Sequence, residues 1–263
     1  MQTRDITQWE TSISEVVSSQ DDEDIVIRGR PLNELIGQIT FTDVMFLMLQ
    51  GRLPTDAERH VLDALLVASV EHGIAPPSMI ARCYASYGTT IQAAVGAGVS
   101  AFGDKMGGLG EQLARLMFEE ASAGSLTQAS SDAEIDAIAK SIVVRYSDNG
   151  QRLPGFGIPY HNADPRAPEV LSVAKRQGTY SLYCRFAHSL EQALAEQRQG
   201  KSVPMNLDGV GAAIILDLGF AWQSARLFLI TPRTVSMGAH YLEEAEQNTT
   251  WRHVPSANIS YQE

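Results

Sequence analysis

Apolar residues recur every three or four positions along most of this chain, and glycines and prolines interrupt the pattern. This spacing places apolar side chains on one face of a helix, whereas a half-buried strand needs strict alternation. The pattern predicts helices over residues 32–39, 42–51, 55–73, 79–87, 91–102, 107–122, 132–144, 164–177, 180–199, 208–218, 222–230 and 231–247. Only residues 25–27 and the last few residues have an extended pattern. The sequence therefore predicts an all-α protein of roughly ten helices.

Local signals mark several of the expected helix ends. Thr55 followed by Glu58 is a capping box, in which a hydroxyl and a carboxylate satisfy backbone amides reciprocally. Thr42 is expected to cap the helix that follows it, an apolar run through Met45, Phe46 and Leu49 that ends at Gly51. Glycine destabilises a helix interior by about 1 kcal/mol, so Gly96 and Gly98 within 91–102 indicate a close approach between helices.

Two polar stretches suggest a division into lobes. Residues 121–131 and Gly200-Lys201-Ser202 have the composition of hinges. The expected architecture is two-lobed, with a large helical domain over 1–124 and 206–263 and a small helical domain over 125–205.

Charge and composition exclude several classes of protein. Twenty Lys and Arg residues stand against 31 Asp and Glu residues, giving a net charge of −11, so the chain lacks the basic footprint of a nucleic-acid-binding protein. Cys83 and Cys184 have no metal-site spacing and are expected to be reduced, buried residues. There is no apolar run of ~20 residues that would span a bilayer, and the polar, acidic first thirty residues are unlike a targeting peptide. We therefore expect a cytoplasmic protein with no metal site and no membrane or nucleic-acid partner.

Three segments contain residues that a helical core does not need: 103–108, 155–166 and 206–211. Each has an ordinary structural explanation when taken alone. Gly107-Gly108 makes a turn, Asp164 before Pro165 is a good N-cap pair, and Asp208 is a good N-cap.

The order of these segments and of further motifs is more specific. From the N-terminal side, the motifs are Ile27-Arg28-Gly29, Gly51-Arg52-Leu53-Pro54, Glu71-His72-Gly73, Gly155-Phe156-Gly157, Asp164-Pro165-Arg166, Asn206-Leu207-Asp208-Gly209, Arg233-Thr234-Val235, Ala239-His240 and Trp251-Arg252-His253. On these residues the chain resembles the citrate synthase superfamily, especially its citryl-CoA lyase-like branch, which includes the C-terminal module of ATP-citrate lyase.

The resemblance implies a two-lobed all-α homodimer that closes over a coenzyme A thioester and a polycarboxylate. It also implies that the chain makes or breaks the carbon–carbon bond between an acetyl-CoA unit and an oxaloacetate-type keto acid, through an enolate. Such chemistry needs a carboxylate that moves a proton at the thioester α-carbon and cations that hold the other carboxylates.

Residue by residue, Asp208 matches the catalytic carboxylate of the family and His72 the histidine near the keto oxygen. The carboxylate-binding arginines correspond to Arg166, Arg233 and Arg252, with Arg252 reaching the site of the neighbouring subunit. The loops expected to contact coenzyme A contain Lys105, Gly107, Gly108, Gly155 and Gly157. Structural salt bridges for Arg166 and Arg233, and a capping or packing role for His72, are the alternatives.

Two positions depart from the family pattern. Met106 stands where citrate synthases have their first active-site histidine, a change that ATP-citrate lyases share, and Ile158 replaces the histidine expected after Gly155-Phe156-Gly157. His161 lies three residues further and is a candidate replacement. These changes leave two alternatives: a non-catalytic protein that binds polycarboxylates or coenzyme A, and a lyase acting on a different 3-hydroxy-acyl-CoA.

Overall fold

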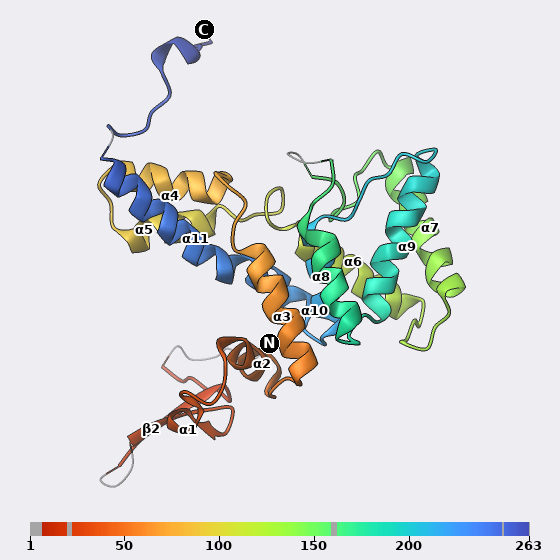
Figure 1. Cartoon of the computed structure of the whole chain (residues 1–263), viewed down its shortest axis with the longest axis horizontal. Coiled ribbons are helices and arrows are strands. Elements are labelled where there is room, and N and C mark those ends of the chain that lie inside the picture. Colours follow the sequence, from red (N-terminus) through yellow and green to blue (C-terminus); the bar gives the residue numbers. More distant parts are fainter. Residues whose placement is uncertain (1–6, 20–22, 159–161, 249, 263) are drawn as a thin grey trace. The chain divides into compact units, whose positions relative to one another are not determined.

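The structure is a computed structural model that describes residues 7–19, 23–158, 162–248 and 250–262 (Figure 1). Eleven α-helices lie in this part of the chain, with three short strands, which confirms the predicted all-α class. The chain divides into two compact units, residues 1–63 and 64–263. The predicted domains 1–124 with 206–263, and 125–205, stay a prediction.

The first unit contains the strands, most of which the sequence pattern did not predict. β1 (Ser14–Ser18), β2 (Glu23–Ile27) and β3 (Arg30–Pro31) form an antiparallel sheet in that order. The extended pattern at 25–27 falls in β2, whereas β1 is almost entirely exposed and therefore has no alternation of buried and exposed residues. The helix predicted over 32–39 is only the four-residue α1 (Leu32–Leu35), because the chain turns at Gly37 with a φ of 78°.

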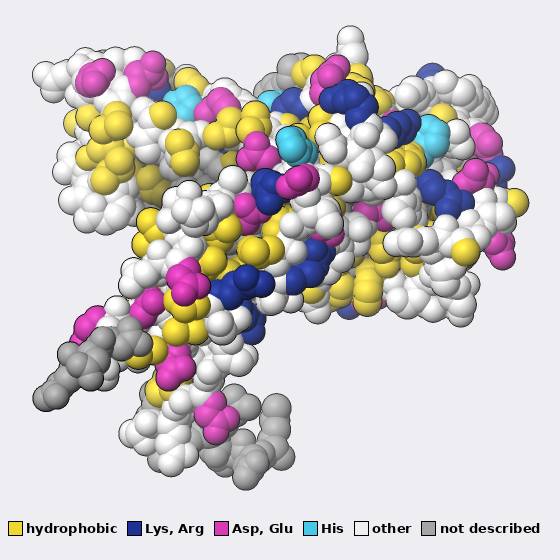
Figure 2. All heavy atoms as spheres, turned by 60° about the horizontal axis from the view of Figure 1, so that its bottom comes forward, with side chains coloured by type: hydrophobic (Ala, Val, Ile, Leu, Met, Phe, Trp, Pro, Cys, Tyr) yellow, Lys and Arg dark blue, Asp and Glu magenta, His cyan; other side chains and the backbone are white. Residues whose placement is uncertain are grey.

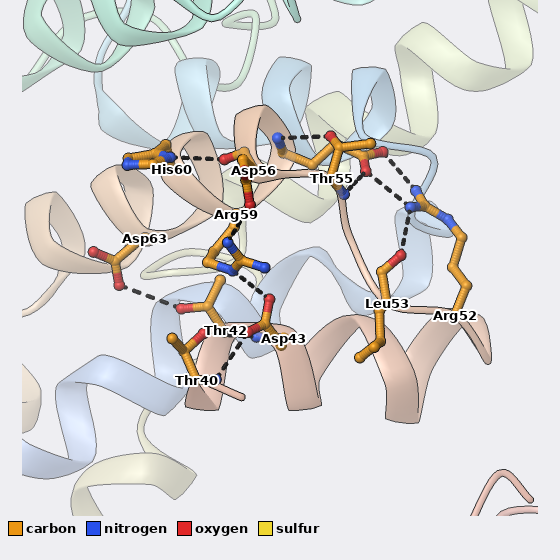
Figure 3. A network of polar contacts seen from close by, with 11 residues as sticks. Thr40, Thr42, Asp43, Arg52, Leu53, Thr55, Asp56, Arg59, His60 and Asp63 are labelled. Carbon is orange, nitrogen blue, oxygen red and sulfur yellow. Dashed lines mark hydrogen bonds and ion pairs between the residues drawn. The ribbon is translucent and has the colours of Figure 1, made fainter. Parts of the chain in front are cut away.

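Helix α2 (Phe41–Gln50) begins at Thr40, so the prediction that Thr42 caps this helix was wrong. The Thr40 hydroxyl accepts from the amide of Asp43 at 3.2 Å, and the Asp43 carboxylate accepts from the amide of Thr40 at 2.8 Å (Figure 3). Asp43 is buried and also accepts from Nε of Arg59 at 2.5 Å. A carboxylate three residues after Thr40 therefore decides the start of the helix, and Thr42 instead donates to Asp63 at 3.3 Å.

The predicted capping box at Thr55 is confirmed. The amide of Glu58 donates to the Thr55 hydroxyl at 3.2 Å, and the amide of Thr55 donates to Glu58 at 2.7 Å (Figure 3). The helix that follows is α3 (Asp56–Ser69). Its first residues belong to the first unit and its last residues to the second.

Among the described residues of the second unit, all the regular elements are helices. α4 (Pro76–Ser86), α5 (Ile91–Ser100) and the long α11 (Ala225–Gln247) pack together as one bundle, visible in Figure 1. α10 (Leu207–Asp217), which is buried along most of its length, packs against α6 (Leu109–Ala123), α8 (Arg166–Arg176) and α9 (Leu182–Gln197), and α7 (Asp132–Asp148) packs against α9. The start of α10 is therefore surrounded by other elements.

The two helices predicted over 222–230 and 231–247 are one. A short 3-10 turn at Trp222–Ser224 leads into α11, which continues through Pro232. Proline destabilises a helix interior by about 3 kcal/mol because it lacks an amide donor. Phe228 before the proline and Met237 after it are both buried, and packing on the two sides of the proline offsets the lost hydrogen bond.

The predicted close helix approach is confirmed at Gly98 but not at Gly96, where a Cβ would have no neighbour within 4 Å. A Cβ at this position would lie 2.2 Å from Sδ of Met237 on α11 and 3.0 Å from the carbonyl oxygen of Pro77 on α4. Only a glycine lets the three helices of this bundle come so close.

Within the described ranges, no helix has both the length and the apolar character needed to cross a bilayer. Cys83 and Cys184 are both free thiols; Cys184 is buried and Cys83 half-buried.

Candidate functional site

A cavity of about 230 Å³ in the second unit brings together most of the site residues that the sequence predicted. Its polar lining consists of His72, Lys105, Asp164, Arg166, Asn206, Asp208 and Arg233. The remainder of the lining is mostly apolar and includes Met106 and Ile158. Residues more than 160 positions apart in the chain, such as His72 and Arg233, therefore face one space.

Asp208 is available to this cavity because another residue caps α10. The side-chain oxygen of Asn206 accepts from the amide of Gly209 at 3.1 Å, so Asn206 is the N-cap and the alternative explanation of Asp208 as the cap is wrong. Asp208 is the second residue of the helix. Among the described residues, no group donates a hydrogen bond to its carboxylate, which leaves both oxygens free to meet a ligand.

The loop at 155–158 is held directly against the start of α10. The carbonyl oxygen of Gly155 accepts from the amide of Asn206 at 3.0 Å, and the Asn206 side chain donates to the carbonyl oxygen of Gly157 at 2.6 Å. A Cβ on Gly209 would lie 2.3 Å from the oxygen of Gly155, so only glycine permits this approach. The contact fixes Ile158 in the wall of the cavity.

Asp164 holds Arg166 in place. Nε and Nη2 of Arg166 donate to the two carboxylate oxygens of Asp164 at 2.9 and 2.8 Å, and the Arg166 amide donates to Asp164 at 3.1 Å. The N-cap of α8 is Pro165, so the alternative in which Asp164 is the N-cap is wrong. The amide of Leu207 adds a fourth bond at 3.0 Å and ties the buried Asp164 to α10. Burial alone would raise the pKa of Asp164, but these hydrogen bonds hold it below the ordinary value. The ionised Asp164 therefore orients the guanidinium of Arg166.

Arg233 lies on α11 and is buried, with Nε donating to the carbonyl oxygen of Ser69 at 2.7 Å. Burial lowers the pKa of Arg233. Burial also raises the pKa of Asp208, and the positive charges of Arg166 and Arg233 oppose this shift without cancelling it. The cavity thus combines two fixed cations with one carboxyl group whose proton is held more tightly than usual.

Of the three remaining residues that the sequence predicted for the site, only His72 is found in the described lining of the cavity. His72 lines the cavity, and its backbone amide donates to the Glu71 carboxylate at 2.7 Å. His161 lies outside the described residues. Arg252 is absent from the lining given above; it forms a two-bond ion pair at 2.7 and 2.8 Å with Glu244, which is buried on α11. Its predicted contact with a neighbouring subunit stays a prediction.

The predicted glycine-rich turn before α6 also faces the cavity. Gly103 and Met106 exchange backbone hydrogen bonds at 2.9 and 3.1 Å, which closes the turn and directs Lys105 and Gly107 to the cavity lining. Gly108 is buried instead: a Cβ there would lie 2.8 Å from Nη2 of Arg226. Gly108 and Gly155 are therefore not in the cavity lining, and they allow close packing of the segments beside it.

Sequence reasoning missed the supporting role of two residues. Asp164 was considered only as a helix cap, and Asn206 was named only as part of the motif Asn206-Leu207-Asp208-Gly209. Asp164 lies two positions before α8 and Asn206 one position before α10, and each is followed two positions later by a charged residue, Arg166 and Asp208 respectively. This spacing is the sequence feature that could have predicted the supporting role of both residues. In the part of the chain that the structure describes, no three His, Cys, Asp or Glu side chains gather as a metal-binding group.

Known structures resemble this fold along most of its length. The citryl-CoA lyase from Hydrogenobacter thermophilus is 32% identical with a TM-score of 0.84, and the match covers 97% of this chain and 94% of that one. The ATP citrate lyase from Methanosaeta concilii, solved with (3S)-citryl-CoA, matches 99% of this chain and 42% of its own with a TM-score of 0.77; at 16% identity it supports the fold alone.

Proteins related in sequence also resemble this chain, over a smaller part of their own length. The putative citrate synthase 2 of Mycobacterium tuberculosis is 28% identical over 193 residues, which cover 71% of this chain and 48% of that protein. The citrate synthase of Heyndrickxia coagulans is 25% identical over 229 residues, covering 85% and 56%. This chain thus spans about half the length of these two relatives. The family described as citrate synthase, C-terminal domain, matches residues 56–254. The chain, with its cavity at the start of α10, belongs to the citrate synthase family.

Proposed function

We propose that this protein is a citryl-CoA lyase-like enzyme, which makes or breaks the carbon–carbon bond between an acetyl-CoA unit and an oxaloacetate-type keto acid. The observation that carries the proposal is that Asp208 faces the same cavity as Arg166 and Arg233. The similarity to the citryl-CoA lyase of Hydrogenobacter thermophilus over nearly the whole of both chains supports it.

The two arginines suit the polycarboxylate part of the substrate. A guanidinium binds a carboxylate through two parallel hydrogen bonds, which fixes its orientation as well as its charge. Asp164 and the Ser69 carbonyl hold Arg166 and Arg233 before any substrate arrives. Little side-chain entropy is then lost on binding.

The protonated form of Asp208, which burial favours, suits the cleavage direction. The substrate hydroxyl loses its proton to His72, the carbon–carbon bond breaks, and its electron pair passes into the thioester enolate. Asp208 then gives its proton to the enolate carbon, yielding acetyl-CoA and the keto acid, and regains a proton from His72 or solvent. The reverse sequence forms the bond, with Asp208 as the base. His161 is a second candidate for the proton transfer at the hydroxyl.

The coenzyme A part of the substrate is assigned to the loops of Lys105, Gly107, Gly108, Gly155 and Gly157. Three of these five residues line the cavity, Lys105, Gly107 and Gly157. We further propose that the protein works as a homodimer, in which Arg252 reaches the neighbouring site, and that it is cytoplasmic.

The test is to incubate citryl-CoA with the protein and with Asp208→Asn, and to identify the products by mass spectrometry. The unaltered protein should release acetyl-CoA and oxaloacetate. Asp208→Asn should lose at least ~10²-fold in turnover, since it removes the proton-transfer group, while still binding citrate. Asp148→Asn, an exposed aspartate on α7, is the matched control and should keep full turnover. Equal turnover by Asp208→Asn would refute the assignment.

A second candidate rests on Met106 and Ile158, which both line the cavity. They replace polar histidines of the family pattern with apolar side chains, so the substrate carbon beside them would be less oxygenated than in citryl-CoA. The same assay is repeated with a 3-hydroxy-acyl-CoA that carries one distal carboxylate. Faster cleavage of this thioester than of citryl-CoA would favour the second candidate, and faster cleavage of citryl-CoA would favour the first. Binding of citrate with no turnover of either thioester would favour the non-catalytic alternative.

A further inference from the structure

A line of polar side chains connects α4 and α11 with the edge of the cavity. His240 on α11 lies between two charged groups: its Nε2 is 3.3 Å from Oε2 of Glu71, and its Nδ1 is 3.2 Å from Nη1 of Arg82 on α4. Arg82 is itself held by Glu244 at 2.7 Å and by Gln247 at 3.0 Å. The side chains of His240 and Arg82 are only 16% and 7% exposed, so water competes little for these bonds.

The chemistry of Arg82 fixes the position of the proton on His240. A guanidinium can only donate hydrogen bonds, so the Nδ1 atom that faces it must be the unprotonated acceptor. The proton of the neutral imidazole is therefore on Nε2, where it points at the Glu71 carboxylate. A proton on Nδ1 would place two donors against each other.

Glu71 transmits this arrangement to the cavity. Its second oxygen, Oε1, accepts from the backbone amide of His72 at 2.7 Å, and its own carbonyl oxygen lies 3.5 Å from Nη1 of Arg166. His72 and Arg166 both line the cavity. The Glu71 side chain is thus bonded to the backbone of one candidate site residue on one side and to His240 on the other.

We propose that His240 is a positioning residue for the reaction: as the Nε2–H tautomer set by Arg82, it orients Glu71, and Glu71 holds the segment that presents His72 to the substrate. His240 lies outside the cavity lining and acts through Glu71 alone. The effect on turnover rests on the proposed function, whereas the tautomer and its effect on His72 do not.

The kinetic test compares His240→Gln with His240→Phe. A glutamine amide can donate to Glu71 and accept from Arg82, whereas phenylalanine can do neither. We expect His240→Phe to lose about 10- to 100-fold in kcat on citryl-CoA, because small misplacements of reacting groups cost that much. We expect His240→Gln to recover most of that loss, with the KM for the thioester little changed in both. Equal kcat values for the two variants, at equal melting temperatures, would overturn the proposal.

The second measurement needs no turnover and compares the unaltered protein with the same two variants. Nitrogen NMR of ¹⁵N-histidine-labelled protein at neutral pH should show His240, assigned by the signal lost in His240→Gln, protonated on Nε2 and not on Nδ1. His240→Phe should shift the His72 signals. A proton on Nδ1, or unchanged His72 signals, would refute the proposal even if citryl-CoA is cleaved. If citryl-CoA is not cleaved while the tautomer is as expected, the proposed function fails and the positioning of His72 stands.

Discussion

Asp208 links the chemistry of the site to the pH dependence of stability. Burial raises the pKa of this carboxyl in the folded protein, and the nearby positive charges of Arg166 and Arg233 only partly reverse the shift. In the unfolded chain the pKa is near ~3.9. The folded state therefore binds the proton more tightly, so the contribution of Asp208 to stability is largest at low pH and is lost as the pH rises through the folded-state pKa.

Asp208→Asn should consequently raise the melting temperature at pH 7 to 8, because a neutral amide avoids the cost of the buried charge. Each 1 kcal/mol relieved corresponds to roughly 2–4 °C in a chain of this size. The advantage should shrink as the pH is lowered toward 4. Differential scanning calorimetry across this range tests the prediction, with Asp148→Asn as the control expected to change little. A variant less stable than the unaltered protein at pH 8 would contradict the assigned environment.

Single residues differ in how far the sequence predicted them. Asp208, Arg166 and Arg233 were predicted from ordered motifs, and all three line one cavity. Their fixed orientations were not predictable, because they depend on partners that local sequence does not connect: Asp164 bonds the amide of Leu207, 43 positions away, and Arg233 bonds Ser69, 164 positions away.

Among the elements, the start of α2 allows a test with a matched pair of carboxylates. Arg59 binds both the buried Asp43 and the exposed Asp56, at 2.5 and 2.6 Å. Burial alone would raise the pKa of Asp43, but hydrogen bonds from Thr40 and Arg59 hold it below the ordinary value. Asp43 therefore contributes stability above pH ~4 that is lost as the pH falls through its lower, folded-state pKa.

Asp43→Asn should reduce the free energy of unfolding by about 1–2 kcal/mol at pH 7, since it weakens both the capping box and a half-buried ion pair with Arg59. Asp56→Asn, which breaks only an exposed ion pair with the same arginine, should cost at most about 1 kcal/mol. Urea denaturation followed by circular dichroism measures both. Equal losses for the two variants would show that burial of the Asp43 pair adds nothing.

Helices with a continuous apolar face were predicted well, because packing reinforces the local pattern. The failures have specific causes. Residues 222–230 and 231–247 were predicted as two helices, but α11 runs continuously from Ala225 to Gln247, with Pro232 inside it. β1 was missed because its residues are exposed and pair only through the backbone with β2.

At the scale of the whole molecule, the bundle of α4, α5 and α11 exposes large apolar side chains. Val235 and Leu242 on α11 are 69% and 55% exposed, and since seven residues separate them they share one face of the helix. Tyr84 on α4, Tyr87 at the C-terminal cap of α4 and Ile91 on α5 are also exposed. Figure 2 shows hydrophobic side chains gathered on this part of the second unit. Apolar patches of this kind indicate an interface with another protein chain.

We predict that this face forms the homodimer, which would also bring Arg252 near a second copy of the cavity. Light scattering coupled to size-exclusion chromatography should give twice the chain mass of 28.6 kDa at micromolar concentration. The double variant Val235→Glu with Leu242→Glu should be monomeric, because dimerisation would bury two uncompensated charges per chain. Val144→Glu, at an exposed apolar residue of α7, is the control and should stay dimeric. A monomeric mass for the unaltered protein would show that there is no dimer interface. A dimer that survives the double substitution but not Val144→Glu would place the interface elsewhere. In either case the structure would leave Arg252 only its ion pair with Glu244 as a role.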